Sequence, residues 1–165
     1  MSWTASEGTD IPPRRNEITM SEPELERFLD EERVLTCATL GPRGRPHLMP
    51  LWYVRDGPVL LAWTFAKSQK VKNLEREPRA TLQIEAGRDR YGELRGAMLE
   101  CDVTLERDPR RVAEVGLRLM TRYAGAALAP AARERVLQQA PKRVVLRFAP
   151  TRIVSWDHRK LGAGS

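Results

Sequence analysis

Short apolar runs alternate with short polar turns through most of the chain. Runs of β-branched and aromatic residues bounded by Gly, Pro, Asn or Asp are typical of β-strands joined by tight turns. The pattern predicts strands over residues 34–40, 47–54, 59–65, 80–85, 93–106, 144–148 and 153–156. The third run is apolar throughout, which predicts that this strand is buried on both faces.

Apolar residues recur at helical spacing between some of these strands. Helices are expected to begin near residues 21, 68, 108 and 131. Ser21 and Glu24 fit a capping box, while Asp108 followed by Pro109 is a favourable N-cap and first helical position. Pro78 ends the second helix, because a proline inside a helix removes a backbone hydrogen bond.

Six or seven strands joined mostly by tight turns, with peripheral helices, predict a mainly β (α+β) fold. We expect an antiparallel barrel with helical additions rather than alternating βαβ units. Residues 1–20 carry almost no apolar pattern and are expected to form a flexible N-terminal tail. Residues 21–162 then form a single domain, and a chain of 165 residues is long enough for a core without metal or disulfide staples.

The composition, with 41% hydrophobic and 30% charged residues, is that of a globular protein. No apolar run approaches the roughly 20 residues of a transmembrane helix, and no signal-peptide pattern precedes the first strand, so we expect a cytoplasmic protein with no membrane contact. Cys37 and Cys101 are the only cysteines, beside two histidines. Because their spacing matches neither a zinc site nor a disulfide framework, no metal is expected.

The net charge of +6 is concentrated in two places, with +3 over residues 64–79 and +5 over residues 142–165. A basic protein can bind nucleic acid, but the chain has no finger, no RNP-like motif and no long Lys/Arg run. Two short basic segments fit a small phosphorylated ligand better than a long polyanion. We therefore expect no nucleic-acid partner.

Residues 66–74, Ala-Lys-Ser-Gln-Lys-Val-Lys-Asn-Leu, combine an expected helix start with an unusual charge pattern. With Ser68 as the N-cap, Lys70 and Lys72 lie in or beside the first helical turn, although this end of a helix repels cations. A bound anion would remove the conflict, because backbone N–H groups, the serine hydroxyl and the ammonium groups would form a phosphate cradle. The alternative is a solvated basic face on a surface helix.

Flat apolar side chains lie on the two strands that precede this segment. They belong to Met49-Pro50-Leu51-Trp52-Tyr53 and Ala62-Trp63-Thr64-Phe65. An aromatic ring system can lie against such side chains. The alternative is plain core packing, since half of these residues must point into the barrel.

The order of these segments resembles a known family. Residues 47–53, His-Leu-Met-Pro-Leu-Trp-Tyr, precede Trp63-Thr64 and then the segment 67–74 with Pro78-Arg79 after it, as in the split β-barrel flavin and deazaflavin oxidoreductases, the pyridoxamine-phosphate-oxidase-like superfamily. The ending Val-Ser-Trp-Asp-His-Arg-Lys-Leu-Gly, residues 154–162, is similar to the actinobacterial branch that includes enzymes using the deazaflavin coenzyme F420.

The resemblance covers about residues 24–162 and implies a split barrel that forms a homodimer, with two cofactor sites at the subunit interface. True pyridoxamine-phosphate oxidases carry an Arg and Lys pair on the second strand. Here Met49, Pro50 and Leu51 occupy that region. The departure argues against oxidation of vitamin B6.

The resemblance also assigns roles by position. The residues implied to bind the cofactor phosphate are Lys70, helped by Ser68, Gln69 and Lys67. The residues implied to line the isoalloxazine or deazaflavin ring are Met49, Pro50, Leu51, Trp52, Trp63 and Thr64. Tyr91 and Trp156 are candidates for contacts from the partner chain, and a core position in the last strand is the alternative for Trp156.

The leading hypothesis is an oxidoreductase that moves a hydride between F420 or FMN and a small unsaturated or carbonyl-bearing substrate. F420 is preferred, because basic residues beyond Lys70, namely Lys67, Lys72 and Arg79, suit its longer anionic tail. The cofactor carries the redox chemistry, so no acid–base pair is required and no catalytic residue is assigned. The alternative is a non-catalytic flavin or tetrapyrrole carrier or sensor on the same fold.

Overall fold

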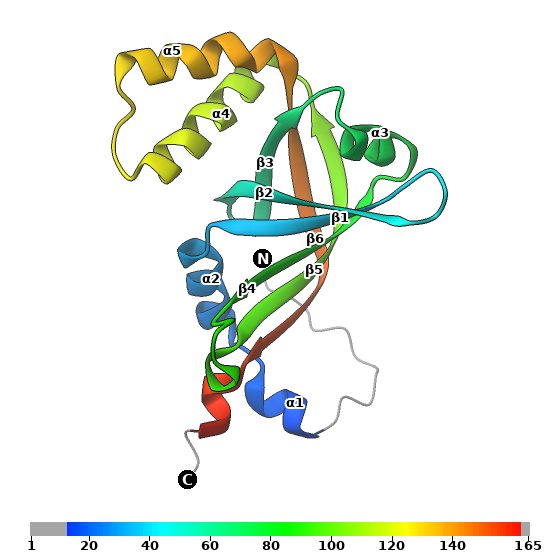
Figure 1. The fold of residues 1–165 in the computed structure, drawn as a ribbon, viewed down its shortest axis with the longest axis vertical. Helices are drawn as coiled ribbons and strands as arrows, with labels where there is room; N and C mark the ends of the chain where they lie inside the picture. Colours follow the sequence, from blue (N-terminus) through cyan, green and yellow to red (C-terminus); the bar gives the residue numbers. More distant parts are fainter. Residues whose placement is uncertain (1–12, 163–165) are drawn as a thin grey trace.

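Six antiparallel strands form a closed barrel in the order β1-β2-β3-β6-β5-β4, and β1 pairs again with β4 (Figure 1). The computed structural model describes residues 13–162. The strands are β1 (Val34–Leu40), β2 (Pro46–Asp56), β3 (Val59–Phe65), β4 (Arg79–Ala86), β5 (Arg95–Glu106) and β6 (Arg143–Asp157). The predicted α+β fold, an antiparallel barrel with peripheral helices, is confirmed.

The helices lie outside the barrel. They are α1 (Pro13–Ile18), α2 (Glu22–Glu31), α3 (Gln69–Arg76), α4 (Pro109–Ala124) and α5 (Pro130–Gln139), with short 3₁₀ turns η1 (Tyr91–Glu93), η2 (Ala140–Lys142) and η3 (His158–Gly162). The capping box of Ser21 with Glu24 is present, and Asp108 accepts from the backbone N–H of Arg111, as predicted. Among the described residues, no helix has the length and apolar character needed to cross a membrane.

The N-terminal segment differs in part from the expected flexible tail. Residues 1–12 lie outside the described part of the chain. Residues 13–18 form α1, and the backbone N–H of Met20, which is buried, donates to Ser155 Oγ at 3.1 Å. Because α1 packs on η3 and β6 through contacts distant in sequence, the local pattern of apolar residues gives no sign of this helix.

The last two predicted strands are one strand, so the structure has six of the six or seven strands expected. β6 runs without interruption from Arg143 to Asp157, and Pro150 lies opposite Cys101 of β5. The register of β5 and β6 shifts between Glu100 and Cys101 at this point. A proline has no N–H to donate, and an irregularity in the ladder of this kind accommodates it.

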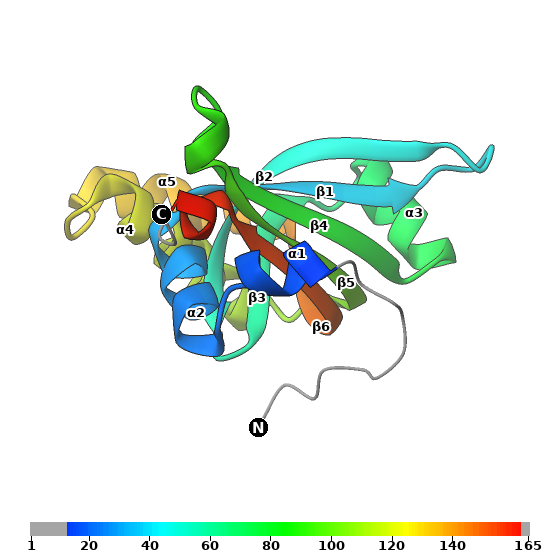
Figure 2. The same cartoon turned by 90° about the horizontal axis from the view of Figure 1, so that it is seen from below.

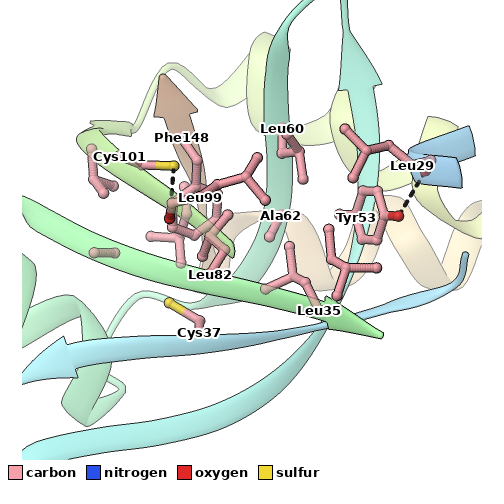
Figure 3. Packing of buried hydrophobic residues seen from close by; sticks show 14 of the residues in the cluster. Leu29, Leu35, Cys37, Tyr53, Leu60, Ala62, Leu82, Leu99, Cys101 and Phe148 are labelled. Carbon is pink, nitrogen blue, oxygen red and sulfur yellow. Dashed lines mark hydrogen bonds between the residues drawn. The ribbon is translucent and has the colours of Figure 1, made fainter. Parts of the chain in front are cut away.

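β3 separates two apolar clusters. Leu60 and Ala62 point into the barrel, where they pack in the interior core drawn in Figure 3, while Leu61 and Trp63 lie in a second cluster beneath α4 and α5. The prediction that this strand is buried on both faces is confirmed. Cys37 belongs to the interior core and, like Cys101, is buried and not disulfide-bonded.

The barrel is split between β2 and β3. The two strands pair only from Tyr53 opposite Ala62 to Asp56 opposite Val59, and residues 46–52 of β2 pair with β1 alone. The β1–β2 hairpin therefore extends beyond the body of the barrel (Figure 2). Several apolar side chains of this hairpin are exposed: Val34, Leu40, Leu48, Met49 and Trp52.

Helix α4 fixes the edge of the split. The ring of Tyr123 stacks on Trp52 with centroids 4.2 Å apart, and its hydroxyl accepts from the backbone N–H of Tyr53 at 3.1 Å. This bond falls where the ladder between β2 and β3 ends. The side chain of Tyr123 thus takes the place of the missing strand partner and holds β2 away from β3.

Candidate functional site

The segment between β3 and α3 folds as predicted, but Ser68 does not use its side chain as a cap. Its backbone N–H donates to Phe65 O at 3.0 Å, which closes a turn, and Ser68 takes the N-cap position of α3. The side chain makes no capping hydrogen bond. Its Oγ is buried without a partner among the described residues, so this hydroxyl is free to bind a ligand.

Lys70 is a buried cation. Its side chain is only 7% exposed, and Nζ donates to Thr64 Oγ1 at 3.2 Å. No carboxylate of the described residues forms an ion pair with it. Burial lowers the pKa of Lys70, and the positive charge of Arg143 lowers it further. An ammonium group has three donors, so Lys70, two residues after Ser68, retains hydrogen-bonding capacity that no described residue uses.

The other predicted phosphate ligands are placed differently. Gln69 donates from Nε2 to Asn73 Oδ1 at 2.9 Å, and Asn73 donates to Thr39 Oγ1 at 3.0 Å, which ties α3 to β1. Part of the amide of Gln69 is therefore engaged within the protein. Lys67 is exposed in the turn before α3.

A pocket of about 380 Å³ lies between the split and α4. It brings together four of the predicted ring-lining residues, Pro50, Leu51, Trp52 and Trp63. Its other lining residues are Val34, Leu119, Met120, Gln139 and Arg143. The two remaining predicted residues do not line it: Met49 is exposed on the hairpin, and Thr64 is buried against Lys70.

Close approach of α4 to β3 shapes this pocket. A Cβ on Gly116 of α4 would lie 2.9 Å from two carbon atoms of the Trp63 indole, so only glycine fits there. Trp63 is 9% exposed, and its Nε1 is buried without an acceptor in the described part of the chain. An indole N–H left without an acceptor is unfavourable unless a ligand supplies one.

Sequence reasoning missed Arg143, the first residue of β6. Its guanidinium carbon lies 3.6 Å from the centre of the Phe65 ring and 4.8 Å from that of Trp63, and Nη2 donates to Gln139 Oε1 at 2.8 Å. Its Nε is buried without an acceptor, and burial lowers the pKa of Arg143. The basic excess of residues 142–165 was the only indication in the sequence.

Tyr91 and Trp156 lie at the other end of the barrel, away from the pocket. Tyr91 is 74% exposed in η1, with its ring against His158. Trp156 is half-buried and covers Gly96 of β5, where a Cβ would lie 2.3 Å from the indole. Within one chain, neither residue reaches the pocket. The contact with Gly96 gives Trp156 a packing role within one chain, and its contact with a partner chain stays a prediction.

A second hollow, of about 440 Å³, is lined mainly by residues of β1, β4 and β5. Four of the charged groups at this hollow are in ion pairs: Arg79 pairs with Glu77 at 2.7 Å, and Glu100, which lines it, pairs with Arg152 at 2.8 Å. It contains none of the predicted site residues. Its larger volume therefore does not make it the better candidate.

The structure is thus a split barrel with a mostly apolar pocket and with buried donors that have no partner among residues 13–162. The family model for pyridoxamine 5'-phosphate oxidase matches residues 21–157. The chain therefore belongs to the pyridoxamine 5'-phosphate oxidase family, in the split β-barrel superfamily that the sequence resembled.

Solved structures agree with this assignment. A conserved hypothetical protein from Mycobacterium tuberculosis is 39% identical, with a TM-score of 0.82 over 90% of this chain and 92% of that one. An F420 reductase is 25% identical, with a TM-score of 0.60 over 78% and 94% of the two chains. HutZ, the heme storage protein of Vibrio cholerae, is 18% identical with a TM-score of 0.63 over 81% and 94%, which shows a common fold alone. No curated protein matches the chain significantly.

Proposed function

We propose that the protein is an oxidoreductase that binds F420, or FMN in its place, and transfers a hydride between this cofactor and a small unsaturated or carbonyl-bearing substrate. The observation that carries the proposal is that two buried polar groups at the start of α3 have unused hydrogen-bonding capacity among residues 13–162: the Oγ of Ser68 has no partner, and the ammonium group of Lys70 has no carboxylate. A phosphate supplies the acceptors that both groups lack. The residues present thus fit the phosphate of a flavin-type cofactor.

The chain's own residues position such a cofactor and exclude water. Ser68 and Lys70 hold the phosphate, and Thr64 positions the ammonium group of Lys70 by accepting one of its hydrogen bonds. Trp52 and Trp63, which line the pocket together, offer apolar surface to the faces of a ring. The cofactor, when bound, supplies the hydride chemistry, and the protein supplies position and a dry site.

The charge argument for F420 over FMN is weaker in the structure than in the sequence, because fewer basic side chains are unpaired. Arg79 is engaged by Glu77 and cannot count as a free cation for an anionic tail. Lys67 and Lys72 are exposed and pair with no carboxylate in residues 13–162, so they remain available. The 25% identity to an F420 reductase supports the same preference.

We further propose that the chain acts as a homodimer and that the β1–β2 hairpin forms part of the contact. Several apolar side chains of this hairpin are exposed, and exposed apolar surface of this kind marks an interaction site. Tyr91 and Trp156 would then approach the pocket of the partner. Light scattering of the full chain and of Leu48→Glu tests this: a dimer converted to a monomer supports it, and a monomeric wild type contradicts it.

The experiment that tests the cofactor is a titration of the purified apoprotein with F420 and, separately, with FMN, followed by fluorescence. Tight binding of F420 alone, weakened by added salt, is the expected result. Reduction of a set of unsaturated and carbonyl acceptors by the bound reduced cofactor then separates an enzyme from a carrier. Binding of neither cofactor contradicts the proposal and leaves a tetrapyrrole carrier as the alternative.

A further inference from the structure

The donors around the site lie on two opposite faces of the β3–β6 ladder. Successive residues of a strand point to opposite sides, so Thr64, which binds Lys70, and Trp63, which contacts Arg143, face away from each other. Phe65 pairs with Arg143 in the register of β3 and β6, on the same face as Trp63. Lys70 and Arg143 therefore lie on different faces of the ladder, although the charge of Arg143 is near enough to lower the pKa of Lys70.

Arg143 is held in place without an anionic partner. Phe65 and Trp63 contact its guanidinium, and Gln139 accepts one of its N–H groups at 2.8 Å. No carboxylate among residues 13–162 pairs with it, and its Nε has no acceptor. An arginine fixed this firmly by neutral neighbours is prepared for a planar acceptor group on a ligand.

The pocket that Arg143 lines has mostly apolar walls. Trp52, Trp63, Leu119 and Met120 surround it, whereas Ser68 and Lys70 are not among the lining residues. A phosphate placed here would lose its hydration against these walls, which is unfavourable. A flat ring with carbonyl groups along one edge buries its faces against the walls and offers acceptors to N–H donors. The volume of about 380 Å³ lies within the range of small-ligand pockets.

We propose that Arg143, together with the indole N–H of Trp63, binds the carbonyl-bearing edge of the flavin or deazaflavin ring, while Ser68 and Lys70 bind the phosphate. This inference rests on the proposed function and assigns a ring-binding residue that the sequence did not indicate. The pocket then selects a flat conjugated ligand with hydrogen-bond acceptors at one edge.

The test compares ligands with and without the phosphate. FMN and riboflavin form one such pair, and F420 and its phosphate-free riboflavin-level chromophore form another. Dissociation constants are measured by fluorescence titration for the full-length wild type, Lys70→Met, Arg143→Met and the control Arg147→Met. Arg147 lies on the same strand and faces Glu106 at 3.9 Å, outside the pocket.

Arg143→Met is expected to weaken both members of a pair by the same factor, roughly 10- to 100-fold, the scale of a lost charge-assisted hydrogen bond. Lys70→Met is expected to weaken only the phosphate-bearing member, and Arg147→Met neither. Arg143→Lys keeps the charge but loses the planar fork, so it should also weaken both members, by less. Thermal melting of each variant checks that it folds, and Arg143→Lys carries the test if Arg143→Met does not fold.

Two results would overturn the inference and are distinct from a failure of the proposed function. If the Arg143 variants weaken FMN but bind riboflavin as the wild type does, Arg143 binds phosphate. If they weaken neither ligand, Arg143 is not part of the site. If instead the wild type binds neither FMN nor F420, the proposed function is wrong, and the inference falls with it.

Discussion

Particular cations near the two ends of β6 differ in whether a carboxylate pairs with them, and β6 has Arg143 at its first position and Asp157 at its last (Figure 1). At the end near α1 and η3, Arg159 pairs with Asp157 at 2.6 Å and Lys160 pairs with Glu24 at 2.6 Å. At the end near α3, Lys70 and Arg143 have no carboxylate partner within the described residues. A protein of net charge +6 can leave some cations unpaired, but unpaired exposed cations are solvated, whereas Lys70 is buried.

Arg122 of α4 shows that absence of a carboxylate alone does not mark a site. Its guanidinium donates to the carbonyl oxygens of Tyr53, Asp30 and Glu32, and so caps the C-terminal end of α2. Its donors are satisfied, and its role is structural. What distinguishes Arg143 and Lys70 is capacity for hydrogen bonds that nothing in the described chain uses.

The largest effect is expected on stability, at Arg122, whose hydrogen-bond donors are used by backbone carbonyl groups. Arg122→Ala leaves the carbonyl groups at the end of α2 without their donor and should lower the free energy of unfolding by about 3 kcal/mol. Urea unfolding measures this. Arg110, on the first turn of the same helix, has no side-chain hydrogen bond to any described residue, so Arg110→Ala should stay within about 0.5 kcal/mol of the wild type. Equal losses in both variants would contradict the structural role of Arg122.

The next effect concerns the unsatisfied lysine. Lys70→Ala should leave the fold intact and weaken binding of the phosphorylated cofactor by about 1.5–3 kcal/mol, because a charge-assisted hydrogen bond is lost. Lys160→Ala is the matched control from the paired end of the barrel. It should bind the cofactor as the wild type does, and unchanged affinity in Lys70→Ala would refute the phosphate assignment.

A third effect follows from the lowered pKa of Lys70. Because burial lowers this pKa below the ordinary 10.5, free Lys70 loses its proton at a lower pH than an exposed lysine does. The proton is needed to bind phosphate, so the affinity for FMN should fall as pH rises from neutrality toward 10.5, by more than the affinity for riboflavin does. The stability of the free protein has the opposite pH dependence. A buried cation without a carboxylate partner destabilises the folded state, so the free energy of unfolding increases as pH rises through the lowered pKa of Lys70 and the cation loses its proton. A constant ratio of FMN to riboflavin affinity over this range contradicts the assignment.

Local patterns predicted the fold well wherever local interactions decide it. The strands over residues 34–40 and 59–65 begin and end as expected, and the cap at Asp108 is where the sequence indicates. The break at Pro150 was wrong, because the irregular pairing that accommodates a proline depends on β5, some fifty residues away. Helix α1 was missed for the same reason, since it packs on distant elements.

The candidate site was predictable only in part. Residue spacing and family resemblance predicted Lys70 and the aromatic residues of β2 and β3 as site residues, and the structure brings Trp52 and Trp63 to one pocket. Arg143 was not predictable from local sequence. It lies beside Phe65 because β3 pairs with β6, and in this pairing Phe65 is opposite Arg143, 78 residues later in the chain. Arg79 was taken as a free cation, although Glu77, two residues earlier, pairs with it.

The smallest effect is expected at the paired end, and it changes stability rather than binding. Hydrogen bonds from Lys160 and from the backbone of Ser21 lower the pKa of Glu24 to about 2 from 4.5. A lowered carboxyl pKa stabilises the folded state above pH 4.5, and this contribution is lost as pH falls from 4.5 toward 2. Because Glu24 is 41% exposed, solvent screens the pair, and we expect about 1 kcal/mol or less. Glu24→Gln should therefore flatten this part of the stability profile, measured by urea unfolding, while cofactor affinity stays unchanged. A variant whose stability still falls as steeply as that of the wild type would show that other carboxylates carry the acid sensitivity.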